Sequence, residues 1–117
     1  MRAIIIAVMA AALWNSSASA QKVGGSYTVS GTNPNGSTYG GTVQITPVGS
    51  TCRITWQTGS THSSGVCMLA NKAFAAYYRL GNDHGLVVYE LMPDGRLKGF
   101  WTIVDREGVG TETLTPR

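Results

Sequence analysis

The chain has 117 residues, of which 43% are hydrophobic and only 13% are charged, and its formal net charge is +3. This length fits one domain, and the hydrophobic fraction excludes an intrinsically disordered protein. The Lys and Arg residues are scattered rather than clustered, so we expect no nucleic-acid partner.

Residues 1–20 have the pattern of a secretory signal peptide. Arg2 supplies the positive charge, an apolar run extends over residues 3–13, and Ala18 and Ala20 form a small-x-small cleavage site. The alternative is a transmembrane anchor, but a bilayer-spanning helix needs ~20 apolar residues, and this run is much shorter. We therefore expect an exported protein, periplasmic or secreted, with no membrane span after cleavage.

Residues 21–117 are expected to form a single domain of short antiparallel strands. Gly, Ser and Thr interrupt the sequence at short intervals, and no segment has a convincing amphipathic helix pattern. One segment is ambiguous, because the alanines within residues 73–80 would also suit a helix. The eight expected strands span residues 26–31, 39–47, 51–58, 63–69, 73–80, 86–92, 97–104 and 109–115.

Apolar and polar residues alternate along these strands. In residues 51–58, for example, Cys52, Ile54 and Trp56 share one face and polar residues occupy the other. Short connections and the removal of exposed edges favour an all-β fold, an eight-stranded antiparallel up-and-down β-barrel with one disulfide. A two-sheet β-sandwich is the alternative. The expected interior is Tyr27, Val29, Tyr39, Val43, Ile45, Ile54, Trp56, Phe74, Tyr78, Val87, Tyr89, Leu91, Leu97, Trp101 and Ile103.

The two cysteines test how neighbouring strands pair. If the chain turns at Gly59 and Ser60, counting back along both strands places Cys52 directly opposite Cys67 on the inner face. Because an exported protein meets an oxidising compartment, we expect a Cys52–Cys67 disulfide. The alternative is two free buried thiols.

The aromatic side chains of the expected interior favour a filled barrel. Small residues, Gly41, Gly65, Gly99 and Ala76, would make room for the rings. Trp56 and Trp101 are then expected to be core residues rather than ligand contacts. The alternative is that the aromatic rings line a pocket.

A resemblance to a known family is carried by four stretches, GSYTVSGTNPNGSTYGGTVQI, TCRITWQTGSTHSSGVC, GLVVYELMPDGRLKGFWTI and GVGTETLTP. They resemble a family of short exported, mostly hypothetical β-proteins of Gram-negative bacteria, sometimes labelled fibronectin-binding. The resemblance implies export and a small β fold, and it transfers no catalytic residues. At the level of fold alone, the expected barrel is also similar to small periplasmic inhibitors of secreted metalloproteases and of lysozyme.

The sequence has no recognisable catalytic motif: no GxSxG, no HExxH, no Walker loop and no calcium loop. A triad of a serine, His62 or His84, and Asp105 can be assembled only by chance combination in a serine-rich chain. We therefore expect no enzyme, no cofactor and no metal site.

We expect a monomeric binding or inhibitory module that acts on an extracytoplasmic protein partner. The alternatives are a small-molecule carrier with a ligand pocket inside the barrel, and an enzyme. A cavity lined by Tyr39, Trp56 and Trp101 would favour the carrier, whereas a histidine and a carboxylate together in a cleft would favour the enzyme.

Successive turns of an up-and-down barrel alternate between its two ends. The connections at residues 32–38, 59–62, 81–85 and 105–108 therefore share one end, which gathers many polar side chains. Binding residues are often found on loops held by a rigid scaffold, although these residues would also suit ordinary soluble turns. The residues expected to contact a partner are Asn35, His62, His84 and Arg106.

Overall fold

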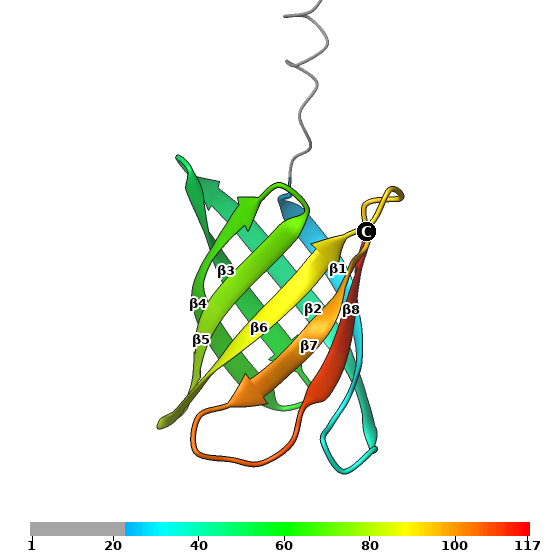
Figure 1. The fold of residues 1–117 in the computed structure, drawn as a ribbon, viewed down its shortest axis with the longest axis vertical. Helices are drawn as coiled ribbons and strands as arrows, with labels where there is room; N and C mark the ends of the chain where they lie inside the picture. Colours follow the sequence, from blue (N-terminus) through cyan, green and yellow to red (C-terminus); the bar gives the residue numbers. More distant parts are fainter. Residues whose placement is uncertain (1–22) are drawn as a thin grey trace, which may run out of the picture.

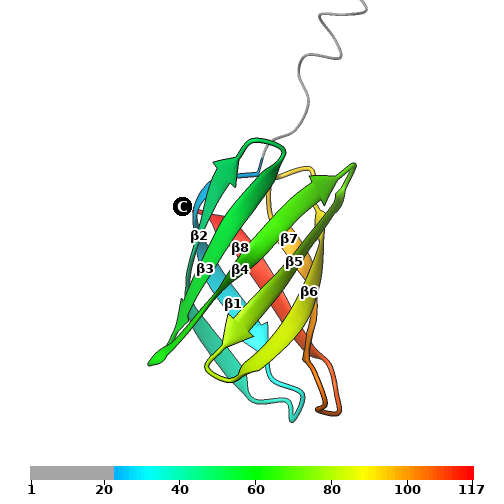
Figure 2. The ribbon, with the colours of Figure 1, turned by 90° about the vertical axis from the view of Figure 1, so that its left-hand side faces the viewer.

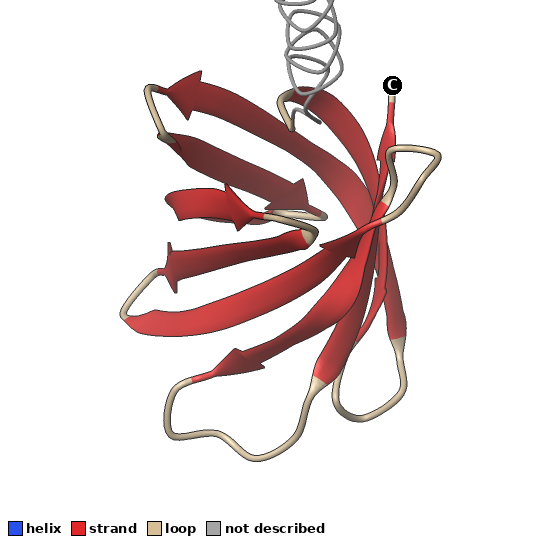
Figure 3. Cartoon of the chain, turned by 45° about the horizontal axis from the view of Figure 1, so that its top comes forward, coloured by secondary structure: helices blue, strands red, loops and turns tan. Residues whose placement is uncertain are grey.

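The fold is known from a computed structural model that describes residues 23–117; the expected signal peptide lies outside the described residues. The described chain forms eight antiparallel strands, which close into a barrel in chain order (Figures 1 and 2). Strands joined by loops make up the whole of the barrel (Figure 3). The strands are β1 (Gly25–Thr32), β2 (Thr38–Val48), β3 (Thr51–Thr58), β4 (Thr61–Ala70), β5 (Ala73–Leu80), β6 (Asp83–Leu91), β7 (Leu97–Ile103) and β8 (Gly110–Pro116).

The predicted eight-stranded up-and-down barrel is confirmed, and the sandwich alternative is wrong. The bounds of β3 and β5 are those predicted, and the other strands differ from prediction by one to three residues at an end. The alanine-containing segment is a strand because its residues alternate: Phe74, Ala76 and Tyr78 are buried, and the residues between them are exposed. Within residues 23–117 no helix has the length and hydropathy that a membrane crossing needs.

Four of the connections are two-residue turns. They begin at Gly49, Gly59, Asn71 and Gly81, which have φ angles between 57° and 63°. A positive φ at the first turn position gives the twist that joins two antiparallel strands. Because each strand reverses direction after its turn, every second connection lies at the same end of the barrel.

The two ends of the barrel differ. The "loop end", at the bottom of Figure 1, carries the connections at residues 33–37, 59–60, 81–82 and 104–109. The "terminal end", at the top, carries the other three connections and both ends of the described chain. The predicted grouping of four connections at one end therefore agrees with the topology.

The core is formed by the inward-facing side chains. Tyr39, Trp101 and Ile103 are only half-buried, whereas the other predicted interior residues are buried. Leu114 is fully buried although the sequence pattern did not single it out. The residues with almost no exposure are Tyr89, Phe74, Ile45, Ile54, Leu97 and Leu114.

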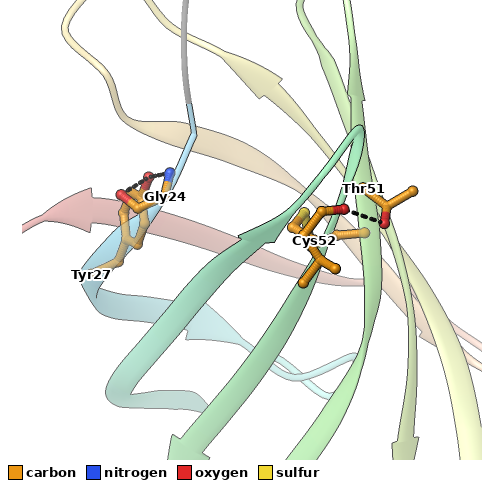
Figure 4. The surroundings of a disulfide bond; sticks show 6 residues. Gly24, Tyr27, Thr51 and Cys52 are labelled. Atoms are coloured by element: carbon orange, nitrogen blue, oxygen red, sulfur yellow. Dashed lines mark hydrogen bonds between the residues drawn. A yellow bond between two sulfur atoms is a disulfide. The ribbon is translucent and has the colours of Figure 1, made fainter.

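The disulfide joins β3 and β4 in the predicted register. Cys52 faces Cys67, and their Cα atoms are 5.0 Å apart, a normal separation for a disulfide. Figure 4 shows the bond beside the turn between β2 and β3, where the Thr51 hydroxyl donates to the Val48 carbonyl at 3.1 Å. The predicted disulfide is confirmed, and it fits an oxidising, extracytoplasmic compartment.

Candidate functional site

The barrel interior is hollow toward the loop end. A cavity of about 310 Å³ lies there, and its wall takes side chains from seven strands and from the β1–β2 loop. Several of these side chains are partly exposed, so the cavity communicates with solvent. The lining residues are Asn33, Tyr39, Trp56, Thr58, Thr61, Ser63, Tyr78, Leu80, Val87, Trp101, Ile103 and Glu112.

The predicted filled interior therefore holds only toward the terminal end. Toward the loop end, Tyr39, Trp56 and Trp101 line the cavity, which is the arrangement predicted for a carrier. The space exists because short polar residues occupy inward positions opposite the rings. Ser63, for example, lies directly across from Trp56 in the β3–β4 pair, and it is too small to fill the lumen.

Three of the cavity rings lie against glycines of other strands, and one of them is Tyr78 against Gly85 of β6. A Cβ atom on Gly31 would overlap the ring of Tyr39, and one on Gly110 would overlap the indole of Trp101. The absence of a side chain at these glycines therefore leaves the room that the rings occupy.

The glycines singled out in the sequence have a different role. A Cβ atom on Gly41, Gly65 or Gly99 would overlap a backbone carbonyl oxygen of the adjacent strand. These three residues allow two backbones to approach closely where the sheet bends. The atoms that come nearest to these glycines are therefore backbone atoms rather than aromatic rings.

Glu112 of β8 is a buried carboxylate in the cavity wall, with 6% of its surface exposed. Its Oε1 accepts a hydrogen bond from the Tyr39 hydroxyl at 2.7 Å. Its Oε2 accepts one from Trp56 Nε1 at 2.8 Å and one from the Tyr89 hydroxyl at 2.5 Å. One carboxylate thus ties together side chains from β2, β3 and β6.

The hydroxyl groups of the tyrosines around Glu112 have raised pKa values. Burial, followed by the charge of Glu112, raises the pKa of Tyr78 to about 12. The same two causes, with a hydrogen bond to the carboxylate, raise the pKa of Tyr39 and of Tyr89 above the usual value. These hydroxyls are therefore protonated at neutral pH and act as donors.

The four cavity rings form two edge-to-face pairs. The ring centroids of Tyr39 and Trp101 are 6.2 Å apart, and those of Trp56 and Tyr78 are 5.5 Å apart. Hydrogen bonds fix the polar tips of these rings: Trp101 Nε1 donates to a backbone carbonyl at 3.2 Å, and so does the Tyr78 hydroxyl at 2.8 Å. The cavity is therefore preorganised, since little side-chain freedom is left for a ligand to restrict.

Two of the predicted partner-binding residues lie on loops at the loop end. Asn35 accepts a hydrogen bond at its Oδ1 from the Ser37 backbone N–H at 2.9 Å, so its side chain stabilises its own turn. Arg106 forms an ion pair with Asp83 at 2.7 Å, which links the β7–β8 loop to the start of β6. Both side chains are exposed, and neither lines the cavity.

The two histidines lie in strands rather than in loops. His62 is the second residue of β4 and His84 the second residue of β6, and both are exposed on the outer wall. The His84 ring meets Tyr77 edge-on, with centroids 5.8 Å apart. The predicted placement of both histidines on loops is wrong because these strands extend two and three residues further than their sequence patterns indicate. That Asn35, His62, His84 and Arg106 contact a partner remains a prediction.

Sequence reasoning missed Glu112, although a signal for it exists. In β8 the buried residues alternate, so an inward Leu114 implies an inward residue two positions before it. A charged residue at such a position marks a buried polar group that needs hydrogen-bond partners. The tyrosines and the tryptophan of neighbouring strands supply those partners here.

Comparisons with known proteins show the fold alone. No protein-family model and no curated protein matches the chain. A redesigned β-barrel is similar over 80% of this chain and 90% of its own, with a TM-score of 0.72 and 20% identity. A de novo designed fluorescence-activating β-barrel is similar over 81% of this chain and 94% of its own, with a TM-score of 0.64 and 12% identity. The chain is thus similar in architecture to designed β-barrels.

Proposed function

We propose that this protein binds a small molecule inside the loop end of its barrel and acts as an exported carrier or binding protein. The observation that carries the proposal is the cavity of about 310 Å³ walled by four aromatic rings and one buried carboxylate. This volume lies at the small end of the range for ligand sites, which are about 300–1,000 Å³. Mostly apolar walls with a few fixed polar groups are typical of such sites.

The proposed setting is the periplasm or the extracellular medium. The signal-peptide pattern of residues 1–20 and the disulfide both support export. Cleavage after Ala20 would also remove Trp14, which leaves Trp56 and Trp101 as the only tryptophans. Both line the cavity, so the intrinsic fluorescence of the mature protein is a direct reporter of ligand binding.

The test is native mass spectrometry of the exported protein, together with tryptophan fluorescence titrations against small-molecule extracts of the medium and envelope. We expect a bound compound of low mass and a change in emission on titration. Retention of no compound, with no emission change for any extract, would contradict the proposal.

Two matched variants locate the binding event. Ser63 faces into the cavity and Ser64, its neighbour on β4, is exposed on the outer wall. Ser63→Phe is expected to fill the cavity and abolish ligand retention, whereas Ser64→Phe adds the same side chain outside and should retain the ligand. Equal retention by both variants would place the ligand elsewhere.

A second candidate function, a module that binds or inhibits an extracytoplasmic protein, is favoured by the outer wall of β4 to β7. Exposed apolar patches of this kind mark interaction sites. Residues that pair across these strands form two apolar rows, one of Val66, Tyr77 and Leu86 and the other of Met68, Ala75, Val88 and Phe100. The most exposed members are Val66, Met68, Leu86, Val88 and Phe100, at 50–60%. A partner would then be a protein that offers an apolar surface to this wall.

Capture of a protein from envelope or medium by the mature chain tests this candidate. Val88→Lys, in the middle of the apolar rows, should abolish capture if the outer wall is the contact. Alanine substitutions at Asn35, His62, His84 and Arg106 should weaken it if the loop end is the contact. Capture that neither set weakens would contradict both placements.

A further inference from the structure

The cavity holds one charge. Glu112 is the one charged side chain among the lining residues that the structure describes. Both ion pairs of the described chain, Arg96–Asp94 and Arg106–Asp83, lie elsewhere, on exposed side chains. The carboxylate is therefore buried without a protein cation beside it.

The hydrogen bonds to Glu112 do not neutralise it. Its three donors, Tyr39, Trp56 and Tyr89, are uncharged groups that keep their protons. An ionised carboxylate has room for about four hydrogen bonds, so one acceptor position is left. Buried charges in proteins are commonly paired with an opposite charge, and a cationic ligand would supply one beside Glu112.

The aromatic rings around the carboxylate suit a cation. The faces of Trp and Tyr rings carry negative charge, and they attract ammonium groups within about 6 Å of the ring centre. Four such rings, those of Tyr39, Trp56, Tyr78 and Trp101, line the same cavity as Glu112. Aromatic cages of this composition recognise alkylated ammonium groups in other proteins.

We infer that the cavity binds a small organic cation, an alkylated ammonium compound, with its charge near Glu112 and its alkyl groups against the aromatic rings. The inference rests on the proposed small-molecule function and names the class of ligand. An anion would be repelled by the carboxylate. Among the described residues no group of three or more His, Cys, Asp or Glu side chains is placed to hold a metal ion, and the one carboxylate of the cavity already accepts three hydrogen bonds.

The test compares choline with its uncharged carbon isostere, in which a tert-butyl group replaces the trimethylammonium group. The two probes have nearly the same shape, so a difference in affinity reports charge. Fluorescence titration of the mature protein should show choline binding about tenfold more tightly than the isostere, as expected for a desolvated cation on aromatic rings. Equal or tighter binding of the isostere would overturn the inference.

Glu112→Gln tests the carboxylate itself, because it keeps the shape of the side chain and removes the charge. It should weaken choline binding about tenfold and leave binding of the isostere unchanged. Thermal melting shows whether the variant folds; if it does not, the two-probe comparison on the wild-type protein decides alone. An unchanged preference for choline in the folded variant would overturn the role of Glu112.

The outcomes separate the inference from the function on which it rests. If neither probe binds but native mass spectrometry finds that the protein retains an uncharged or anionic compound, the cation inference is wrong and the binding function stands. If neither probe binds and no compound is retained, both fail.

Discussion

The two halves of the barrel lumen are built by the same strands and differ in what they contain. Toward the terminal end, Ile45, Phe74 and Leu97 are fully buried and fill the lumen. Toward the loop end, the inward positions carry aromatic rings, short hydroxyl residues and Glu112. One alternating pattern can thus build both a packed core and an open cavity, since side-chain volume decides which of them forms.

The largest expected effect separates the two halves by stability. Phe74→Ala, in the packed half, is expected to lower the free energy of unfolding by about 3–5 kcal/mol, because it leaves a cavity among fully buried neighbours. Trp101→Ala, in the open half, should cost less than about half as much, because its indole is half-buried and borders empty space. Urea denaturation measures both. Equal losses would mean that the loop end is packed as tightly as the terminal end.

The disulfide belongs to the packed half, and its loss is the next largest effect. Replacing Cys52 and Cys67 with alanine should lower the free energy of unfolding by about 3 kcal/mol, the value for a closed loop of this size. Ligand retention by the folded variant should persist, because the cavity lining includes neither cysteine. If the variant melts cooperatively but no longer retains the ligand, the disulfide in the packed half is needed to keep the cavity in shape.

Gly110→Ala tests whether the glycine beside Trp101 keeps the open half open. The new methyl group overlaps the indole of Trp101, so the ring must move into the lumen, at a cost of about 1–3 kcal/mol. The emission maximum of tryptophan should shift, and ligand affinity should fall. Gly40→Ala is the control, since Gly40 is exposed and its nearest neighbour is a carbonyl oxygen 3.5 Å away. If the two variants had the same emission spectrum, the absence of a side chain at Gly110 would not determine the position of the Trp101 indole.

Alkaline pH should destabilise the open half through Tyr78. The unfolded chain loses the Tyr78 proton near pH 10, whereas the folded chain keeps it until about pH 12, because burial and then the charge of Glu112 raise its pKa. Between these pH values the unfolded state binds fewer protons, so the free energy of unfolding falls as pH rises. This contribution is complete below pH 10. Tyr78→Phe should make the fall shallower; an unchanged slope would contradict the assignment.

The smallest effect on stability is expected for the exposed side chains of the loop end. Arg106→Ala removes the ion pair with Asp83, and exposed pairs contribute only about 0–1 kcal/mol. Melting should therefore change little, and ligand retention should be unaffected. A large loss of stability would show that the β7–β8 loop helps to hold the open half together.

The strands and their pairing could be predicted from the sequence because their causes are local. Two-residue turns beginning at Gly59 and Gly81 fix where the chain reverses, and alternation then assigns the faces. The opposition of Cys52 and Cys67 follows from counting residues back from one turn. The ends of β4 and β6 were less predictable, since polar residues continue these strands past the apolar pattern.

The cavity could not be predicted, because the sequence pattern records polarity and not volume. Trp101 and Tyr39 count as core residues in any alternating pattern, whether they fill the lumen or line it. The glycines that leave room for these rings, Gly110 and Gly31, are contributed by other strands. Glu112 was within reach of the pattern, since it lies two residues before a buried leucine, but its three partners come from distant parts of the chain.

The most direct test of a packed half beside a binding half is an NMR titration of the mature protein with compounds extracted from the exported material. The indole N–H signals of Trp56 and Trp101 are expected to shift together, because both rings line the cavity. The amide signals of Leu97 and Phe74, in the packed half, should stay in place. Shifts at Val66, Val88 and Phe100 on the outer wall, with unmoved indole signals, would contradict a ligand inside the barrel.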